Sequence, residues 1–134
     1  MTEGVVRKLI AALAALVLVS LFAHTAAAQQ SKKVPRIGYL TTGSPSSNLP
    51  NREAFREGLR QVGYVEGQNI FIEYRFAESR TERLSDLAAD LVRLKVDVIV
   101  AAGTEAIRAA KKAASTIPIV MAISSDPLGS GLVE

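Results

Sequence analysis

The stretch VDVIVAAGTEAIRAA, Val96–Ala110, decides the fold class. Its apolar, largely β-branched run ends at Gly103, and a helical pattern begins at Thr104 with no loop between them. A continuous apolar run is typical of a strand in a parallel sheet, which helices cover on both faces. A strand that turns directly into a helix also directs the unpaired N–H groups of the first helical turn beyond the sheet edge. The stretch therefore predicts a parallel α/β sheet and marks one edge of it as a candidate ligand site.

The chain after residue 35 alternates between the periodicities of strand and helix. Predicted strands span residues 36–43, 69–77, 96–102 and 117–124, and predicted helices span residues 51–64, 79–95 and 104–115. Asn51 is the expected N-cap of the first helix, and Gly63 the expected residue after its end. Short connections between parallel strands require right-handed crossovers. We therefore predict an α/β fold, a doubly wound parallel sheet with the strand order 2-1-3-4.

Ligands of doubly wound sheets bind beyond the carboxyl ends of the strands, where the strand order reverses. In this chain that rim comprises residues 41–47, 102–105 and 124–126. The Thr104 hydroxyl can cap its helix while the neighbouring N–H groups hold an anion, and the alternative is a plain cap without a ligand. Likewise, the hydroxyl-rich loop at residues 41–47 could bind a ligand or only water. Asp126 could accept a hydrogen bond from an ammonium group or close an Asp-Pro turn.

The composition excludes several classes of function. The chain has no cysteine and a single histidine, His24, so the predicted domain lacks the residues for disulfides, thiol or histidine catalysis and the usual zinc sites. We expect no catalytic residues, no metal and no enzymatic activity. No Walker A or G-x-G-x-x-G pattern occurs, so no cofactor is expected. The formal charge of +3 is small and dispersed, which argues against a nucleic-acid partner.

The N-terminus has the pattern of an export signal. Arg7 and Lys8 precede the apolar stretch Leu9–Phe22, and small residues at Ala26 and Ala28 form an A-x-A cleavage pattern. The alternatives are a membrane anchor or a buried helix, but the apolar stretch is short for a bilayer span. We predict a cleaved signal peptide over residues 1–28, a flexible leader over 29–35 and a domain over 36–134.

Four stretches together resemble a known family. They are RIGYLTTGSP (36–45), AFREGLRQVGYVEGQNIFIEYRFAE (54–78), RLSDLAADLVRLKVDVIVAAGT (83–104) and AAKKAASTIPIVMAISSDPLGSGLV (109–133). They resemble ABC-transporter substrate-binding proteins of the type I periplasmic-binding-protein architecture, in the branch of tryptophan- and tyrosine-type amino-acid binders. The turn at residues 62–70 and the segment 126–133 are the most specific parts of the resemblance.

The resemblance implies a protein of two lobes that close on a small ligand. Such a protein has no cofactor and delivers its ligand to an ABC permease in the inner membrane. It implies export to the periplasm. Position in the fold gives the ligand-binding candidates Ser44, Ser46, Gly103, Thr104, Ser125 and Asp126. Because family members are longer, we expect this chain to be an incomplete N-terminal lobe, a fragment of such a protein.

Two alternatives come from other classes of protein. The first is a free-standing, exported flavodoxin-like domain that binds FMN or a phosphate-bearing ligand through residues 41–46, although this rim lacks an aromatic residue to stack on a flavin. The second is a receiver-like signalling domain, which would need acidic residues where Tyr39, Leu40 and Thr41 stand.

The A-x-A pattern predicts that export cuts the chain after Ala28. Protein recovered from the periplasmic fraction should therefore begin at Gln29, as intact-mass spectrometry would measure. A periplasmic chain that retains Met1 would contradict this prediction.

Overall fold

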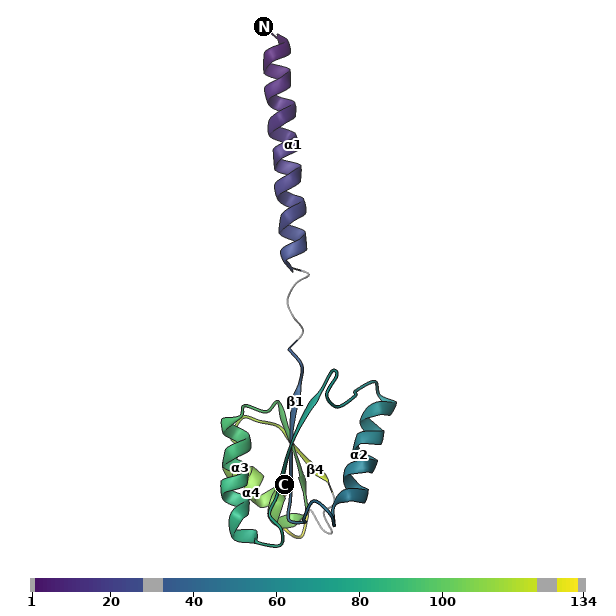
Figure 1. Cartoon of the computed structure of the whole chain (residues 1–134). Coiled ribbons are helices and arrows are strands. Elements are labelled where there is room, and N and C mark those ends of the chain that lie inside the picture. The colour runs from purple at the N-terminus through teal and green to yellow at the C-terminus, as the bar shows by residue number, and fades with distance from the viewer. Residues whose placement is uncertain (1, 28–32, 123–127, 133–134) are drawn as a thin grey trace. The chain divides into compact units, whose positions relative to one another are not determined.

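The computed structural model describes residues 2–27, 33–122 and 128–132 (Figure 1). The chain forms two compact units, Met1–Lys33 and Val34–Glu134. The first contains α1 (Thr2–Ala27). Among the described residues, no helix combines the length and apolar character needed to cross a membrane. The signal peptide and the leader stay predictions.

The second unit is built on a four-stranded sheet. Its strands are β1 (Arg36–Thr41), β2 (Phe71–Phe76), β3 (Val98–Ala102) and β4 (Ile119–Ala122). All neighbouring strands pair in parallel, in the order β2-β1-β3-β4. The predicted fold class and strand order are therefore confirmed.

Helices cover both faces of this sheet. They are α2 (Leu49–Gln61), α3 (Leu84–Arg93) and α4 (Thr104–Ala113), with the short 3-10 helix η1 (Thr81–Arg83) before α3. Figure 1 shows α2 on one side of the sheet and α3 and α4 on the other. Successive residues of β1 and β3 alternate between the two faces, so each central strand supplies both cores. The core on the α3 and α4 side includes Leu40, Leu91, Ile99 and Ile107, and the core on the α2 side includes Ile37, Tyr39 and Val100.

A glycine in β1 allows α3 to pack closely on the sheet. A Cβ atom placed on Gly38 would lie 2.9 Å from Cδ1 and 3.3 Å from Cγ of Leu91. Leu91 is fully buried, so its side chain has little room to move away. The close approach of strand and helix therefore depends on the missing side chain at Gly38.

Helix α2 has Asn48 at its N-cap position, three residues before Asn51, so the prediction that Asn51 caps this helix is wrong. Pro50 lies in the first turn, where its fixed φ suits the helix and its missing N–H is not needed. The expectation that Gly63 follows the helix end is confirmed, because Gly63 has a φ of +89°. After it, Asn69 holds the turn to β2, since its side chain accepts from Val65 N at 2.7 Å and donates to Gly63 O at 2.8 Å.

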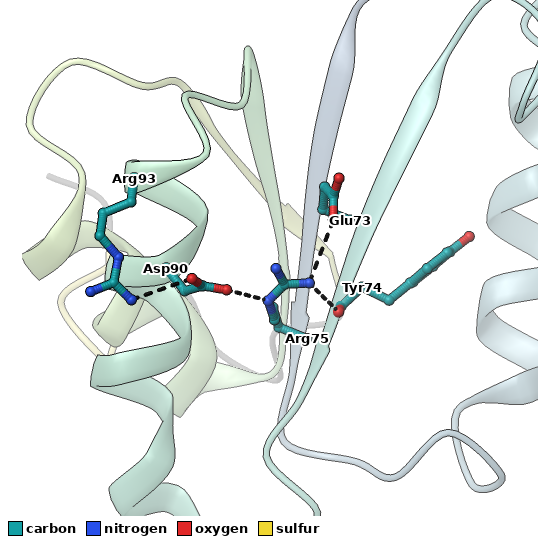
Figure 2. Close-up of polar contacts among 5 residues, drawn as sticks. All are labelled: Glu73, Tyr74, Arg75, Asp90 and Arg93. Atoms are coloured by element: carbon teal, nitrogen blue, oxygen red, sulfur yellow. Dashed lines mark hydrogen bonds and ion pairs between the residues drawn. The ribbon is translucent and has the colours of Figure 1, made fainter.

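An ion-pair network joins α3 to the edge strand β2 (Figure 2). Nε of Arg75 donates to Oδ2 of Asp90 over 2.7 Å, and Nη2 of Arg93 donates to the other carboxylate oxygen over 3.3 Å. Nη1 of Arg75 also donates to Tyr74 O over 2.8 Å and lies 3.6 Å from Oε2 of Glu73. Asp90 is half-buried against Arg75, because the long side chain of this edge-strand residue reaches the helix.

The contact between Gly38 and Leu91 predicts opposite effects for two substitutions. Gly38→Ala should lower the free energy of unfolding by about 1–3 kcal/mol, because the added methyl group overpacks a filled core. Gly58→Ala is the matched control: nothing lies within 4 Å of a Cβ at this α2 position, so alanine should raise stability by up to about 1 kcal/mol. Urea unfolding measures both. Equal effects would show that the close approach at Gly38 carries no cost.

The two guanidinium groups beside Asp90, with hydrogen bonds from Arg75 first and Arg93 second, hold the pKa of that carboxyl below its usual value. A depressed folded-state pKa stabilises the fold above the unfolded pKa of about 4, and this contribution is lost as the pH falls through the folded pKa. Asp90→Asn should therefore melt at a lower temperature than the wild type at pH 7, and the difference should shrink below about pH 4.

Glu82→Gln serves as the control, because Glu82 is exposed and outside this network. Its melting temperature should follow that of the wild type at every pH. A difference for Asp90→Asn that persists unchanged at low pH would assign the effect to packing rather than to charge.

Candidate functional site

The carboxyl ends of three strands meet at one edge of the sheet. Thr41, the last residue of β1, is in register with Phe76 of β2 and Ala102 of β3. Beyond the strands, the loop after β2 bonds to the loop after β1, since Ala77 N donates to Thr41 O at 2.9 Å and Ser79 N to Thr42 O at 2.8 Å. The register thus places the loops after β1, β2 and β3 along one rim.

The structure brings Ser44 and Ser46 together in a compact turn. Their hydroxyl oxygens lie 3.1 Å apart, and the Ser44 hydroxyl donates to Ser47 Oγ over 3.0 Å. The backbone N–H groups of Ser44 and Ser47 each donate to the other serine's hydroxyl, at 3.0 and 3.1 Å. Ser46 and Ser47 are exposed, whereas Ser44 is half-buried. We call residues 44–47 the serine turn. This turn presents three clustered hydroxyls at the rim.

Two buried polar residues anchor the serine turn to the sheet. Thr41 and Asn48 are only 3% and 6% exposed, and Nδ2 of Asn48 donates to Thr41 Oγ1 over 3.4 Å. Gly43 N donates to the same hydroxyl over 3.2 Å. Oδ1 of Asn48 is buried and has no hydrogen-bond partner among the described residues. Sequence reasoning missed Asn48, because an asparagine at the end of a polar loop gives no sign that it will be buried.

The second candidate pair lies at the start of α4. Gly103 occupies the N-cap position with φ 97° and ψ 147°, a conformation that favours glycine, and Thr104 is the first helical residue. The expectation that Thr104 caps the helix is wrong: the cap is Gly103, and no side-chain cap bond forms. Thr104 is half-buried, and its hydroxyl is therefore not committed to capping.

The loops after β1 and β3 face each other. A Cβ atom on Gly103 would lie 3.5 Å from Oγ1 of Thr42, which places the start of α4 beside the loop that leads into the serine turn. The first N–H groups of α4 have no carbonyl partner inside their helix. Hydroxyl groups and helix N–H groups together are suited to an anionic group such as a carboxylate.

Acidic side chains at the rim are paired with arginines. Glu105, in the first turn of α4, lies 3.2 Å from Nη1 of Arg108, and Glu78 lies 3.1 Å from Nη1 of Arg83. These pairs reduce the repulsion that the carboxylates would exert on an incoming anion. Glu78 and Ser79 have positive φ values of 55° and 63° in the loop after β2. Sequence reasoning left this loop out of the rim, although the carboxyl end of the second strand was already predicted to lie at that edge.

Two tyrosines under α2 are not acid–base groups. Burial raises the pKa of Tyr39, while the neighbouring Asn48 and Arg52 act in the opposite direction. Burial, with Glu66 nearby, raises the pKa of Tyr74 to about 12. Both phenols are therefore neutral near pH 7 and serve as packing groups with a polar tip.

The remaining candidates, Ser125 and Asp126, lie outside the described residues. Within the described ranges, no group of three or more His, Cys, Asp or Glu side chains is arranged to hold a metal ion. Of the six candidates, the structure thus brings Ser44 and Ser46 together, places Gly103 and Thr104 at the same rim, and adds Thr42 and Ser47.

Comparison with known families and proteins gives a consistent result. Residues 42–134 match the family model described as ABC transporter substrate binding protein. The chain is 33% identical over 104 residues to a tyrosine-binding protein of Clostridioides difficile strain R20291. The matched region covers 78% of this chain and 30% of that protein.

Solved structures agree in fold. A ligand-free, open substrate-binding protein with adhesive properties from Clostridium difficile has a TM-score of 0.69 and 30% identity, covering 75% of this chain and 34% of that one. An ABC domain in complex with L-Trp from Streptococcus pneumonia has a TM-score of 0.67 and 28% identity, covering 74% and 33%. The chain thus spans about a third of the length of the relatives that it matches.

Proposed function

The chain belongs to the ABC transporter substrate-binding protein family, and from that premise we propose that the carboxyl edge of its sheet forms one side of a binding site for a small solute. The observation that carries the proposal is the convergence of the serine turn and the start of α4 at one rim. Thr42 Oγ1 lies 3.5 Å from a Cβ position on Gly103, so the two loops can contact the same small molecule.

The ligand that this rim suits is an amino acid. Hydroxyls of Ser44, Ser46 and Thr104 and the N–H groups at the start of α4 would hold its carboxylate. Ser125 and Asp126, which follow β4 in the sequence, would receive its ammonium group. Support comes from the relatives, since one is a tyrosine-binding protein and another holds L-Trp.

The domain 36–134 would act as one lobe of a clamp. A good pocket buries about 70–90% of its ligand, and a single open rim covers about half, so a facing lobe would complete the site. In this proposal, residues 1–28 direct export to the periplasm, residues 29–35 form a leader, and the closed protein delivers its ligand to an ABC permease. The chain acts by binding and release, without catalysis, metal or cofactor. Family membership favours this function over the flavodoxin-like alternative.

Substitution of Thr104 tests the site. In a protein that joins this chain to a facing lobe, Thr104→Ala should weaken binding of L-tyrosine about ten- to a hundredfold, which is the effect of losing one hydrogen bond to a charged group. Because the Thr104 hydroxyl makes no cap bond, the melting temperature should change little. Calorimetric titration and thermal unfolding of the same variant measure the two quantities.

Thr104→Ser keeps the hydroxyl and is the matched control, so its affinity should remain near that of the wild type. If Thr104→Ala binds L-tyrosine as tightly as the wild type does, Thr104 does not contact the ligand. A lower melting temperature with unchanged affinity would assign Thr104 a role in helix stability only.

A further inference from the structure

Arg52, a residue of α2, holds the serine turn by a hydrogen bond. Nη2 of Arg52 donates to the carbonyl oxygen of Pro45 over 3.0 Å. Pro45 lies in the middle of the serine turn, between the candidate residues Ser44 and Ser46. A charged donor on a helix therefore fixes the backbone between the two hydroxyls that would contact the ligand.

Two aromatic rings of β2 in turn hold the guanidinium of Arg52. Its central carbon lies 5.4 Å from the ring centroid of Tyr74 and 5.3 Å from that of Phe76. The two rings are stacked, with centroids 6.1 Å apart and planes 10° from parallel. Figure 2 shows the Tyr74 side chain directed away from the Arg75 network, so the two faces of β2 carry separate arginine contacts.

An arginine suits this geometry better than a lysine does. A guanidinium is planar, so it can lie against aromatic rings while its edge donates to a carbonyl. Nε of Arg52 is buried and has no hydrogen-bond partner among the described residues. The aromatic rings and the Pro45 carbonyl are therefore the contacts that set the position of this side chain.

The backbone of α2 transmits this restraint to the end of the serine turn. Arg52 N donates to Asn48 O over 3.0 Å, and Asn48 N donates to Ser44 O over 3.0 Å. Asn48 is also fixed to Thr41 at the end of β1. The turn is thus restrained at its end by Asn48 and at its middle by Arg52.

We propose that Arg52 is a positioning residue for the ligand site: it transmits the position of the β2 aromatic pair to the serine turn and so sets the placement of the Ser44 and Ser46 hydroxyls. The inference rests on the proposed function for its effect on binding, whereas the effect on the turn itself is independent of any ligand.

Arg52→Met and Arg52→Lys in the full chain test the proposal. Methionine removes the donor while packing on the rings, and lysine keeps the charge without the planar contact. Arg52→Met should speed amide hydrogen exchange at Ser47 and Asn48 about tenfold or more, and Arg52→Lys should not restore the slow exchange. Exchange at Leu40 and Ile99, in the opposite core, should be unchanged. Affinity for L-tyrosine should fall about ten- to a hundredfold with Arg52→Met.

Arg60→Met is the matched control, because Arg60 is an exposed arginine of the same helix that pairs with Glu57. Its exchange and binding should equal those of the wild type. The inference is overturned if Arg52→Met leaves exchange at Ser47 and Asn48 unchanged, or if all amides accelerate alike, which would indicate a general loss of stability. If the wild type binds neither L-tyrosine nor L-tryptophan, the proposed function fails for these ligands, and the exchange comparison still decides the role of Arg52.

Discussion

The domain is organised around the parallel pairing of β1 with β3. Both strands are central in the sheet and contribute to both cores, so a one-residue shift in register would move each of their side chains into the opposite core. Because β2 is added on the far side of β1, the strand order reverses between β1 and β3. This reversal separates the loops after the two strands, since one leads to α2 and the other to α4 on the opposite face. The rim between them is the place where a small molecule can contact both.

Local contacts then shape the loops of this rim. Gly103 adopts a backbone conformation that favours glycine, and this lets β3 pass directly into α4 at the edge of the sheet. On the other side, Thr41 and Asn48 place polar groups in the interior to hold the serine turn, and Arg52 holds its middle. The polar residues beneath the turn therefore belong to the proposed site, because they hold the loop that carries its hydroxyls.

The sequence predicts the fold well because the signal is repeated along the chain. Alternation of strand and helix, the apolar run before Gly103 and the short connections each favour a parallel sheet, and together they allow few strand orders. Helix ends are predicted less well. Asn48 rather than Asn51 is the N-cap of α2, and the local sequence offers several polar residues that could cap this helix. The position of Thr104 at the rim was predictable from topology. The prediction that Thr104 caps α4 is wrong, because Gly103, with a positive φ, occupies the N-cap position.

The supporting residues of the site are the part that sequence does not reveal. The bond from Arg52 to Pro45 and the contact of Arg75 with Asp90 join residues on different elements, and each depends on the orientation of a long side chain. Periodicity assigns such residues to a surface, and only packing shows which of them bridge two elements. The loop at Glu78 and Ser79 was missed for a different reason, since its place at the rim follows from strand order rather than from any motif.

If the proposed function is correct, an amino acid binds at the carboxyl edge of this sheet. Amide chemical-shift mapping of the full chain during titration with L-tyrosine tests this, because the method detects weak binding residue by residue. We predict shifts concentrated at residues 42–47 and 103–105, with the turn at residues 63–69 at the opposite edge unaffected. Shifts that cluster at that opposite turn, or that leave both rim segments unchanged while others move, would contradict it.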